Sequence, residues 1–385
     1  MTEASLNLLR LTLTEFRNYK ALSWQPRARM AVLTGPNGSG KTNLLEALSL
    51  LVPGRGLRAA RPGDWALEGG TGRWAVAAQF ERAGVELAVG TGVAPDGPPE
   101  RPSDRRVFRL DGAAPRSQAE VAEVLAATWL TPQAERLFTD PASARRRFLD
   151  RLVWALEPGH AREVSSFETA FASRNRLLRD RADSAWLTAV EDSMARHAVA
   201  VTAARLHLLA RLNATPAPGA FPAVRAELSG ELAGSVASGA ALDAEDRLRT
   251  LLADSRARDA ASGTATEGAH RTDLLLSDAA SGLPAARAST GQQKALLMGL
   301  VLAHARLIED TRGVPALLLL DEPLVHLDRE RRTALFDTLA AGRGPVLLTG
   351  TDPGPFAPLA GLAEQLQTGD GMLRPVSFGT VDPVI

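Results

Sequence analysis

One short glycine-rich segment constrains this chain more than any other part of its sequence. Residues 35–42 read GPNGSGKT and fit G-x-x-x-x-G-K-[ST], a pattern in which backbone N–H groups and a lysine cradle phosphate groups. The apolar run at 30–33 predicts a strand before it, and residues 41–51 predict a helix after it, which is the context that the pattern requires. A glycine-rich turn that binds nothing is the alternative.

Each residue of this segment has an expected role. The glycines let N–H groups turn inward onto phosphate oxygens, and the start of the helix adds positive potential. The lysine is expected to reach the β and γ phosphates of a nucleotide, and the threonine to place its hydroxyl on Mg²⁺. The predicted nucleotide-binding residues here are Gly35, Pro36, Asn37, Gly38, Ser39, Gly40, Lys41 and Thr42.

Two carboxylates end a second apolar run. Residues 317–322 read LLLLDE, and a continuous apolar run is typical of a central strand buried on both faces. Asp321 is suited to the Mg²⁺ of a bound nucleotide, as a direct ligand or through its hydration shell. Glu322 is suited to orienting and deprotonating an attacking water, and is the predicted catalytic residue. Taken alone, the pair also fits two solvated acids at a strand end.

A third motif opens an apolar helix near the end of the sequence. A capping box explains the spacing of Ser289 and Gln292, but not Gly291 or the apolar helix that follows. An exposed helix start is an anion site. We call this predicted anion-binding segment the signature; it comprises Ser289, Thr290, Gly291, Gln292, Gln293 and Lys294.

Apolar periodicity predicts how these motifs are brought together. Toward both ends, strand and helix patterns alternate, with hairpins at 73–89 and around Asp111-Gly112 and a Pro/Gly-rich loop at 91–104. Residues 135–255 have a helical pattern with apolar positions every seven residues from Leu187 to Leu208, and 254–268 read as a loop. We predict an α/β fold in which residues 1–134 and 271–385 form one domain around an inserted helical lobe, residues 135–270.

Composition limits the classes of function. The 385 residues include 44 basic and 44 acidic ones, so net charge gives no sign of a general polyanion binder. The sequence has no cysteines, so we expect no disulfides. It has no long uncharged apolar run and no signal-peptide pattern, so we expect a soluble cytoplasmic protein without a membrane span. Only three basic residues are lysines, namely Lys20, Lys41 and Lys294, and all three fall inside the motifs. This pattern indicates a need for a compact ammonium, to which arginine is not equivalent; chance is the alternative.

Together these motifs resemble the RecF family of ABC/SMC-class ATPases. The resemblance covers nearly the whole chain, through FRNY (16–19), GPNGSGKTNLLEAL (35–48), GRGLR (54–58), RRRFLDRLV (145–153), SRNRLLR (173–179), STGQQKALLMGLVLAHARLI (289–308) and LLLLDEPLVHLDRERR (317–332). It implies an ABC-type P-loop ATPase domain with a mixed sheet and an antiparallel β subdomain, and ATP and Mg²⁺ as cofactors. It also implies an ATP-dependent homodimer in which each signature contacts the γ-phosphate held by the other subunit.

The resemblance further implies a role in DNA repair. Members of the family mark gapped DNA or single/double-strand junctions, where they help RecR and RecO load the recombinase RecA. A nucleoid-associated, cytoplasmic location follows. DNA-contact candidates on the helical lobe are Arg145, Arg146, Arg147, Arg174 and Arg176; because acids lie nearby, a solvated helix face is the alternative for most of them.

Several single residues keep two interpretations. Asp328 matches the D-loop aspartate that crosses to the partner subunit, and also fits a helix N-cap. Arg17 resembles a residue that reaches the nucleotide, or is a surface arginine at a strand end. Gln79 and Gln133 compete as the Q-loop glutamine. Thr351 stands where many ABC proteins have a switch histidine, and since a threonine cannot carry a proton as histidine does, we expect slow hydrolysis.

The sequence departs from the family at two places, and rival functions predict different motifs. EGAHRTDL at 267–274 replaces the usual GPHRDDL, and Gln133 replaces an acidic residue.

An ABC transporter nucleotide subunit would carry an LSGGQ signature and a switch histidine, and an SMC-like clamp would need long heptad arms. A small-molecule kinase would have no use for a signature.

Overall fold

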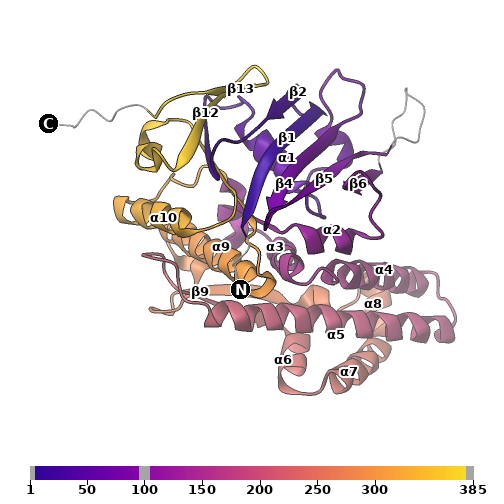
Figure 1. The fold of residues 1–385 in the computed structure, drawn as a ribbon. Helices are drawn as coiled ribbons and strands as arrows, with labels where there is room; N and C mark the ends of the chain where they lie inside the picture. Colours follow the sequence, from indigo (N-terminus) through magenta and orange to yellow (C-terminus); the bar gives the residue numbers. More distant parts are fainter. Residues whose placement is uncertain (1–4, 95–104, 379–385) are drawn as a thin grey trace. The chain divides into compact units, whose positions relative to one another are not determined.

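Two compact units make up the chain, which we describe from a computed structural model over residues 5–94 and 105–378 (Figure 1). Unit 1 comprises residues 1–135, 217–222 and 289–385, and unit 2 comprises 136–216 and 223–288. The insertion thus ends at Ala288, and the predicted boundary at residue 270 is wrong. The reason is strand pairing, because β9 (Asp273–Asp278) pairs antiparallel with β8 (Val224–Ser229), a strand that the helical pattern hid.

A six-stranded sheet of unit 1 runs in the order β13-β12-β3-β11-β10-β7. Its strands are β3 (Met30–Thr34), β7 (Ala127–Leu130), β10 (Leu317–Leu320), β11 (Val346–Gly350), β12 (Ala363–Gly369) and β13 (Met372–Pro375). All neighbours pair in parallel except β12 and β13. The carboxyl ends of β3, β7, β10 and β11 therefore meet at one edge, where open α/β sheets bind ligands.

The second sheet of unit 1 is antiparallel, in the order β2-β1-β4-β5-β6. Its strands are β1 (Leu6–Phe16), β2 (Tyr19–Trp24), β4 (Ala75–Arg82), β5 (Val85–Val93) and β6 (Arg106–Leu110). The hairpin at 73–89 is confirmed as β4–β5. The hairpin around Asp111-Gly112 is reduced to one bridge between Leu110 and Ala113, after which helix α2 begins. Of the predicted loop 91–104, residues 91–93 belong to β5, and 95–104 lie outside the described residues.

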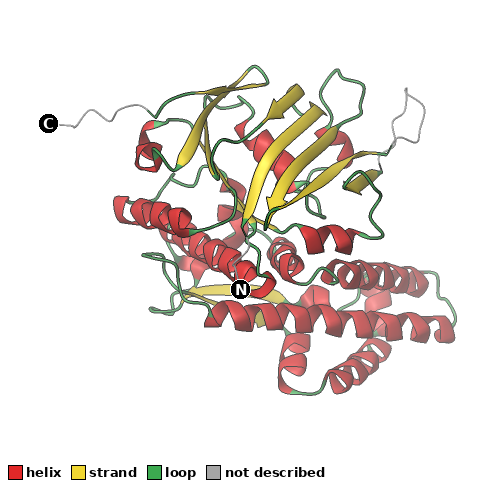
Figure 2. Cartoon of the chain, in the orientation of Figure 1, coloured by secondary structure: helices red, strands yellow, loops and turns green. Residues whose placement is uncertain are grey.

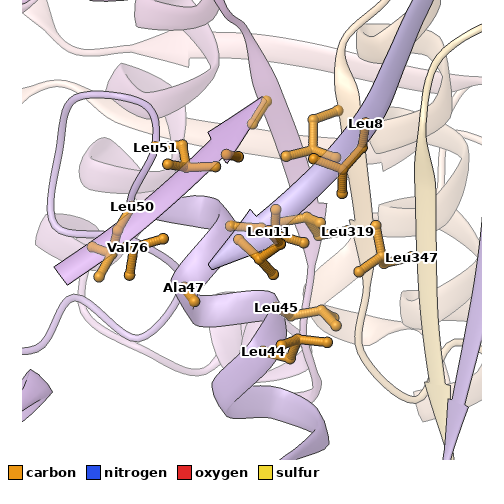
Figure 3. Packing of buried hydrophobic residues seen from close by; sticks show 14 of the residues in the cluster. Leu8, Leu11, Leu44, Leu45, Ala47, Leu50, Leu51, Val76, Leu319 and Leu347 are labelled. Carbon is orange, nitrogen blue, oxygen red and sulfur yellow. The ribbon is translucent and has the colours of Figure 1, made fainter. Parts of the chain in front are cut away.

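Apolar side chains from both sheets and from helix α1 form one core (Figure 3). Leu11 and Val76 come from the antiparallel sheet, Leu45 from α1, and Leu319 and Leu347 from the parallel sheet, and all are buried. The helices and 3-10 helices of unit 1 are α1 (Lys41–Ser49), η1 (Pro62–Trp65), α2 (Gln118–Val124), α9 (Thr290–Arg312), α10 (Arg329–Ala341) and η5 (Gly354–Leu359). A further 3-10 helix, η2 (Pro132–Phe138), crosses the unit boundary. Burial of this shared core fixes α1, and with it the phosphate loop, against the sheet edge.

Helices dominate unit 2 (Figure 2). They are α3 (Ala142–Leu156), α4 (His160–Arg179), α5 (Ser184–Ala214), α6 (Glu231–Ser238), α7 (Ala241–Asp254), α8 (Arg256–Ser262), η3 (Ala269–Arg271) and η4 (Ala285–Arg287). The heptad positions Leu187, Met194, Val201 and Leu208 are all buried on α5, as their spacing predicts. The predicted loop 254–268 is wrong in its middle, where α8 forms. Over the described ranges, no helix combines the length and apolarity needed to span a membrane.

Candidate nucleotide-binding site

The phosphate loop owes its shape to three glycines and to a brace from the FRNY turn. Gly35, Gly38 and Gly40 have φ angles of 147°, 82° and 104°, a region that favours glycine. A Cβ on Gly40 would lie 2.6 Å from the Asn18 side-chain nitrogen and 2.9 Å from the Tyr19 hydroxyl. The buried Tyr19 hydroxyl donates to the Gly40 carbonyl oxygen at 3.1 Å, and burial raises the pKa of this phenol, which keeps it a donor. The sequence had shown only that the chain's single tyrosine stands in FRNY.

Lys41 folds back into the loop that it follows. Its ammonium donates to the carbonyl oxygens of Gly35 at 2.7 Å and Pro36 at 2.9 Å, and the residue is buried. Desolvation lowers the pKa of Lys41, while the carboxylates of Glu322 and Asp321 act to raise it. A buried ammonium that donates to two carbonyl oxygens of the loop suits an added phosphate oxygen.

Thr42 and Asp321 are brought together across 279 positions of sequence. The Thr42 hydroxyl donates to both carboxylate oxygens of Asp321, at 3.0 and 3.1 Å. The hydroxyl of Thr349, at the end of β11, donates to the same carboxylate at 2.7 Å. A hydroxyl and a carboxylate at one point are oxygen donors of the kind that Mg²⁺ takes. Sequence reasoning missed Thr349, for which the only signal was a polar residue ending an apolar strand.

Glu322 follows at the same sheet edge, beside a small hollow. The hollow measures about 160 Å³, and its lining includes Glu322, Thr349, Thr351 and Asp352. It is large enough for a water molecule. Thr351, the residue in place of a switch histidine, thus lines the same hollow as the predicted base.

The signature segment divides into an exposed start and a buried lysine. Ser289 caps α9, with a reciprocal pair in which the Ser289 hydroxyl accepts from the Gln292 N–H and the Gln292 side chain accepts from the Ser289 N–H. Ser289 and Thr290 are exposed. Lys294 is buried, and its ammonium pairs with the Glu135 carboxylate at 3.1 Å and donates to the Glu322 carbonyl oxygen at 2.9 Å. Burial lowers the pKa of Lys294, opposed by Glu135.

Four further predicted residues occupy defined places in unit 1. The Arg17 guanidinium pairs with both oxygens of the buried Glu46, at 2.8 and 2.9 Å, while part of its side chain stays exposed. Asp328 is the N-cap of α10, accepting from the Arg331 N–H at 2.8 Å, which confirms the cap interpretation. Both glutamines are exposed, but Gln133 lies in η2 just after β7, at the edge shared with Asp321, whereas Gln79 lies on β4 of the antiparallel sheet. This location favours Gln133 as the Q-loop residue.

One of the DNA-contact candidates is excluded by burial. Arg174 is completely buried, with bonds to Glu191 at 2.9 Å and Asp259 at 2.7 Å, so it cannot contact a phosphate backbone. Its guanidinium instead joins α4 to neighbouring segments of unit 2.

The other four candidates differ in exposure. Arg145 pairs with Asp273, and Arg146 donates to the Thr272 carbonyl oxygen, so both are half-buried and engaged. Arg147 and Arg176 are exposed.

The fold and this site define an ATPase of the ABC/SMC class. A family model described as "AAA domain, putative AbiEii toxin, Type IV TA system" matches residues 30–76. DNA replication and repair protein RecF of Mesorhizobium japonicum is 45% identical over 377 residues, which span 97% of this chain and 98% of that protein. The RecF of Rhizobium etli is 46% identical over 371 residues, 95% of this chain and 98% of that protein. The chain therefore belongs to the RecF family, as its motifs predicted.

Solved structures agree on the fold. The recombination mediator protein RecF-ATPrS of the RecFOR pathway superposes with a TM-score of 0.83 at 20% identity, over 97% of this chain and 99% of that one. A Smc head domain with an extended coiled coil, derived from Pyrococcus furiosus, gives a TM-score of 0.50 at 14% identity, over 96% of each chain. At these identities the likeness concerns the fold alone, and it confirms the predicted fold class.

Proposed function

We propose that this chain is an ATP-dependent DNA-binding protein of replication, repair and recombination. In this proposal ATP closes a homodimer on gapped DNA or on single/double-strand junctions, and slow hydrolysis releases it. The convergence of Thr42 and Asp321 beside the phosphate loop carries the proposal, because this pair has no evident use without a nucleotide and its metal. The names of the relatives, DNA replication and repair protein RecF, support the DNA role.

The chain's own residues divide the work at the nucleotide. Loop N–H groups and Lys41 bind the β and γ phosphates, and Thr42 and Asp321 hold the metal. Bound Mg²⁺ neutralises charge on the phosphates. Glu322 orients a water and accepts its proton, in the hollow that it lines. Gln133 completes this edge of the sheet as the Q-loop residue.

The dimer follows from having one phosphate loop and one signature in each chain. Two-fold pairing gives each nucleotide a loop from one subunit and a signature from the other. The exposed start of α9 offers Ser289, Thr290 and N–H groups to the partner's γ-phosphate, and Asp328 crosses nearby. Arg17 contributes to the nucleotide site through the exposed part of its side chain.

Two finer features complete the proposal. Thr351 lacks an acid–base group, so hydrolysis is slow and serves to end DNA binding. RecR, RecO and RecA are the pathway partners, and the location is cytoplasmic, at the nucleoid. Membership of the RecF family favours this role over the transporter-subunit and SMC-clamp alternatives.

The decisive test compares Glu322→Gln with Lys41→Ala. The amide keeps the shape of Glu322 but cannot accept a proton, so we expect unchanged ATP binding, turnover at least ~100-fold slower, and accumulation of the closed dimer. Lys41→Ala should lose ATP binding and the dimer together. Light scattering with ATP or ADP and a phosphate-release assay measure these effects. Normal turnover by Glu322→Gln would exclude Glu322 as the base, and ATP-dependent dimers of Lys41→Ala would refute the nucleotide site.

A further inference from the structure

Glu322 has a backbone conformation that both its residue type and the proline after it disfavour. Its φ angle is 48°, in the left-handed region that non-glycine residues seldom adopt. The next residue is Pro323, and a proline pushes the residue before it toward extended backbone with negative φ. Such a conformation persists only where the surroundings impose it.

Two buried side chains hold the two peptide groups of Glu322. On one side, the Thr349 hydroxyl accepts from the Glu322 N–H at 2.9 Å. On the other side, the Lys294 ammonium donates to the Glu322 carbonyl oxygen at 2.9 Å. Thr349 is completely buried and Lys294 is 2% exposed, so water competes little for either bond.

Both holding groups are themselves fixed by a carboxylate. The Thr349 hydroxyl donates to Asp321 at 2.7 Å, so one group orients the Asp321 carboxylate and the Glu322 backbone together. Lys294 is anchored to Glu135 at 3.1 Å, two residues beyond Gln133. A buried ammonium that serves a carboxylate and a carbonyl explains why a lysine stands here in a chain with 44 basic residues and only three lysines.

We propose that Thr349 and Lys294 are positioning residues that hold Glu322 in its left-handed conformation and so aim its carboxylate at the attacking water. The inference rests on the proposed role of Glu322 as the base. It carries a consequence for the dimer, because Lys294 and Ser289 lie on the same helical segment. A signature that binds the partner's nucleotide is thereby connected to the base of its own subunit, and the two sites are coupled.

The first experiment uses near-isosteric variants. Thr349→Val removes the hydroxyl and Lys294→Met removes the ammonium, while Thr349→Ser keeps the hydroxyl as the matched control. We expect kcat for ATP to fall ~10-fold or more in the first two, since small misplacements of a catalytic group are costly. The Kd for ATP should change less than ~3-fold, and Thr349→Ser should retain most of the turnover. Equal losses of kcat and ATP affinity, or an inactive Thr349→Ser, would assign these residues a purely structural role and overturn the inference.

A second experiment separates this inference from the proposed function. Each variant is combined with Glu322→Gln, and the residual turnover of the double variant is compared with that of Glu322→Gln alone. If Lys294 acts through Glu322, Lys294→Met adds no further loss, and Thr349→Val adds only the smaller loss that comes from its bond to Asp321. A full additional loss overturns the inference, and so does wild-type kcat in both single variants while Glu322→Gln is slow. Normal turnover by Glu322→Gln alone would instead contradict the proposed function, because Glu322 could then not be the base.

Discussion

Tyr19 shows how a residue without a role at the phosphates can still control the phosphate loop. It lies fully buried beneath Gly40, whose lack of a side chain makes room for the tyrosine hydroxyl. The hydrogen bond to the Gly40 carbonyl oxygen fixes the last turn of the loop before α1 begins. The geometry that receives the nucleotide therefore depends on the β1–β2 turn of the other sheet.

Replacing Tyr19 with phenylalanine tests this brace. The Gly40 carbonyl oxygen would lose a buried partner, which costs about 1 kcal/mol and lowers Tm by ~2–4 °C. We also expect ATP binding to weaken several-fold, because the loop is less well ordered. Differential scanning fluorimetry with and without ATP measures both effects. A Tm decrease with an unchanged ATP-induced shift would mean that Tyr19 stabilises the fold but not the loop.

Helix α4 shows why two neighbouring arginines of one motif have different roles. The buried positions Phe167, Ala170, Arg174 and Leu178 recur at helical spacing, so Arg174 lies within the apolar stripe, while Arg176 lies outside it. A buried guanidinium persists here because Glu191 and Asp259 neutralise it.

We predict opposite phenotypes for these two arginines. Arg174→Ala leaves the buried Asp259 without its guanidinium partner and Glu191 with Arg256 alone, which should destabilise unit 2 by ~3–5 kcal/mol. Arg176→Ala and Arg147→Ala should leave Tm within about 1 °C and weaken DNA binding equally across sequences, with a smaller salt slope. Thermal melting and fluorescence anisotropy across a salt series distinguish these effects. If the Arg147/Arg176 double variant keeps wild-type affinity for DNA, the DNA-binding surface lies elsewhere on the protein.

The elements also show how much of the fold and of the site can be predicted from the sequence. The long apolar runs and the heptad stripe predicted β3, β10 and α5 because each buries a regular pattern. The pairing of β8 with β9 was missed, since it joins two short segments far apart in sequence, and pairing depends on the tertiary fold. In the site, the phosphate loop and Asp321 could be predicted from their motifs. Thr349 could not, because its role depends on where β11 lies beside β10.

At the scale of the whole molecule, two-fold pairing makes a prediction about mixtures. Ser289→Arg places a bulky cation at the start of α9 and should block closure, while each subunit still binds ATP. Lys41→Ala fails for a different reason, since it lacks the phosphate-binding lysine. A mixed dimer retains one composite site with both motifs intact, so we expect hydrolysis to recover to at most about half of the wild-type rate in the mixture.

The measurement is ATP turnover and dimer mass across mixing ratios, with each variant alone as the control. Recovery that peaks near equal proportions supports the sandwich arrangement. No recovery at any ratio would contradict it.

Unit 1 is assembled from segments that a ribosome makes at very different times. The phosphate loop is synthesised well before its partners, since Thr42 meets Asp321 279 residues later, and Ser39 meets Thr368 329 residues later. All of unit 2 emerges in between and has its own buried core, so it has the opportunity to fold first. A nascent chain therefore carries its phosphate-binding motif long before it can close a nucleotide site. Competence to bind ATP therefore waits for the segments that carry Asp321 and Thr368, and so does the ATP-dependent pairing on DNA that we propose.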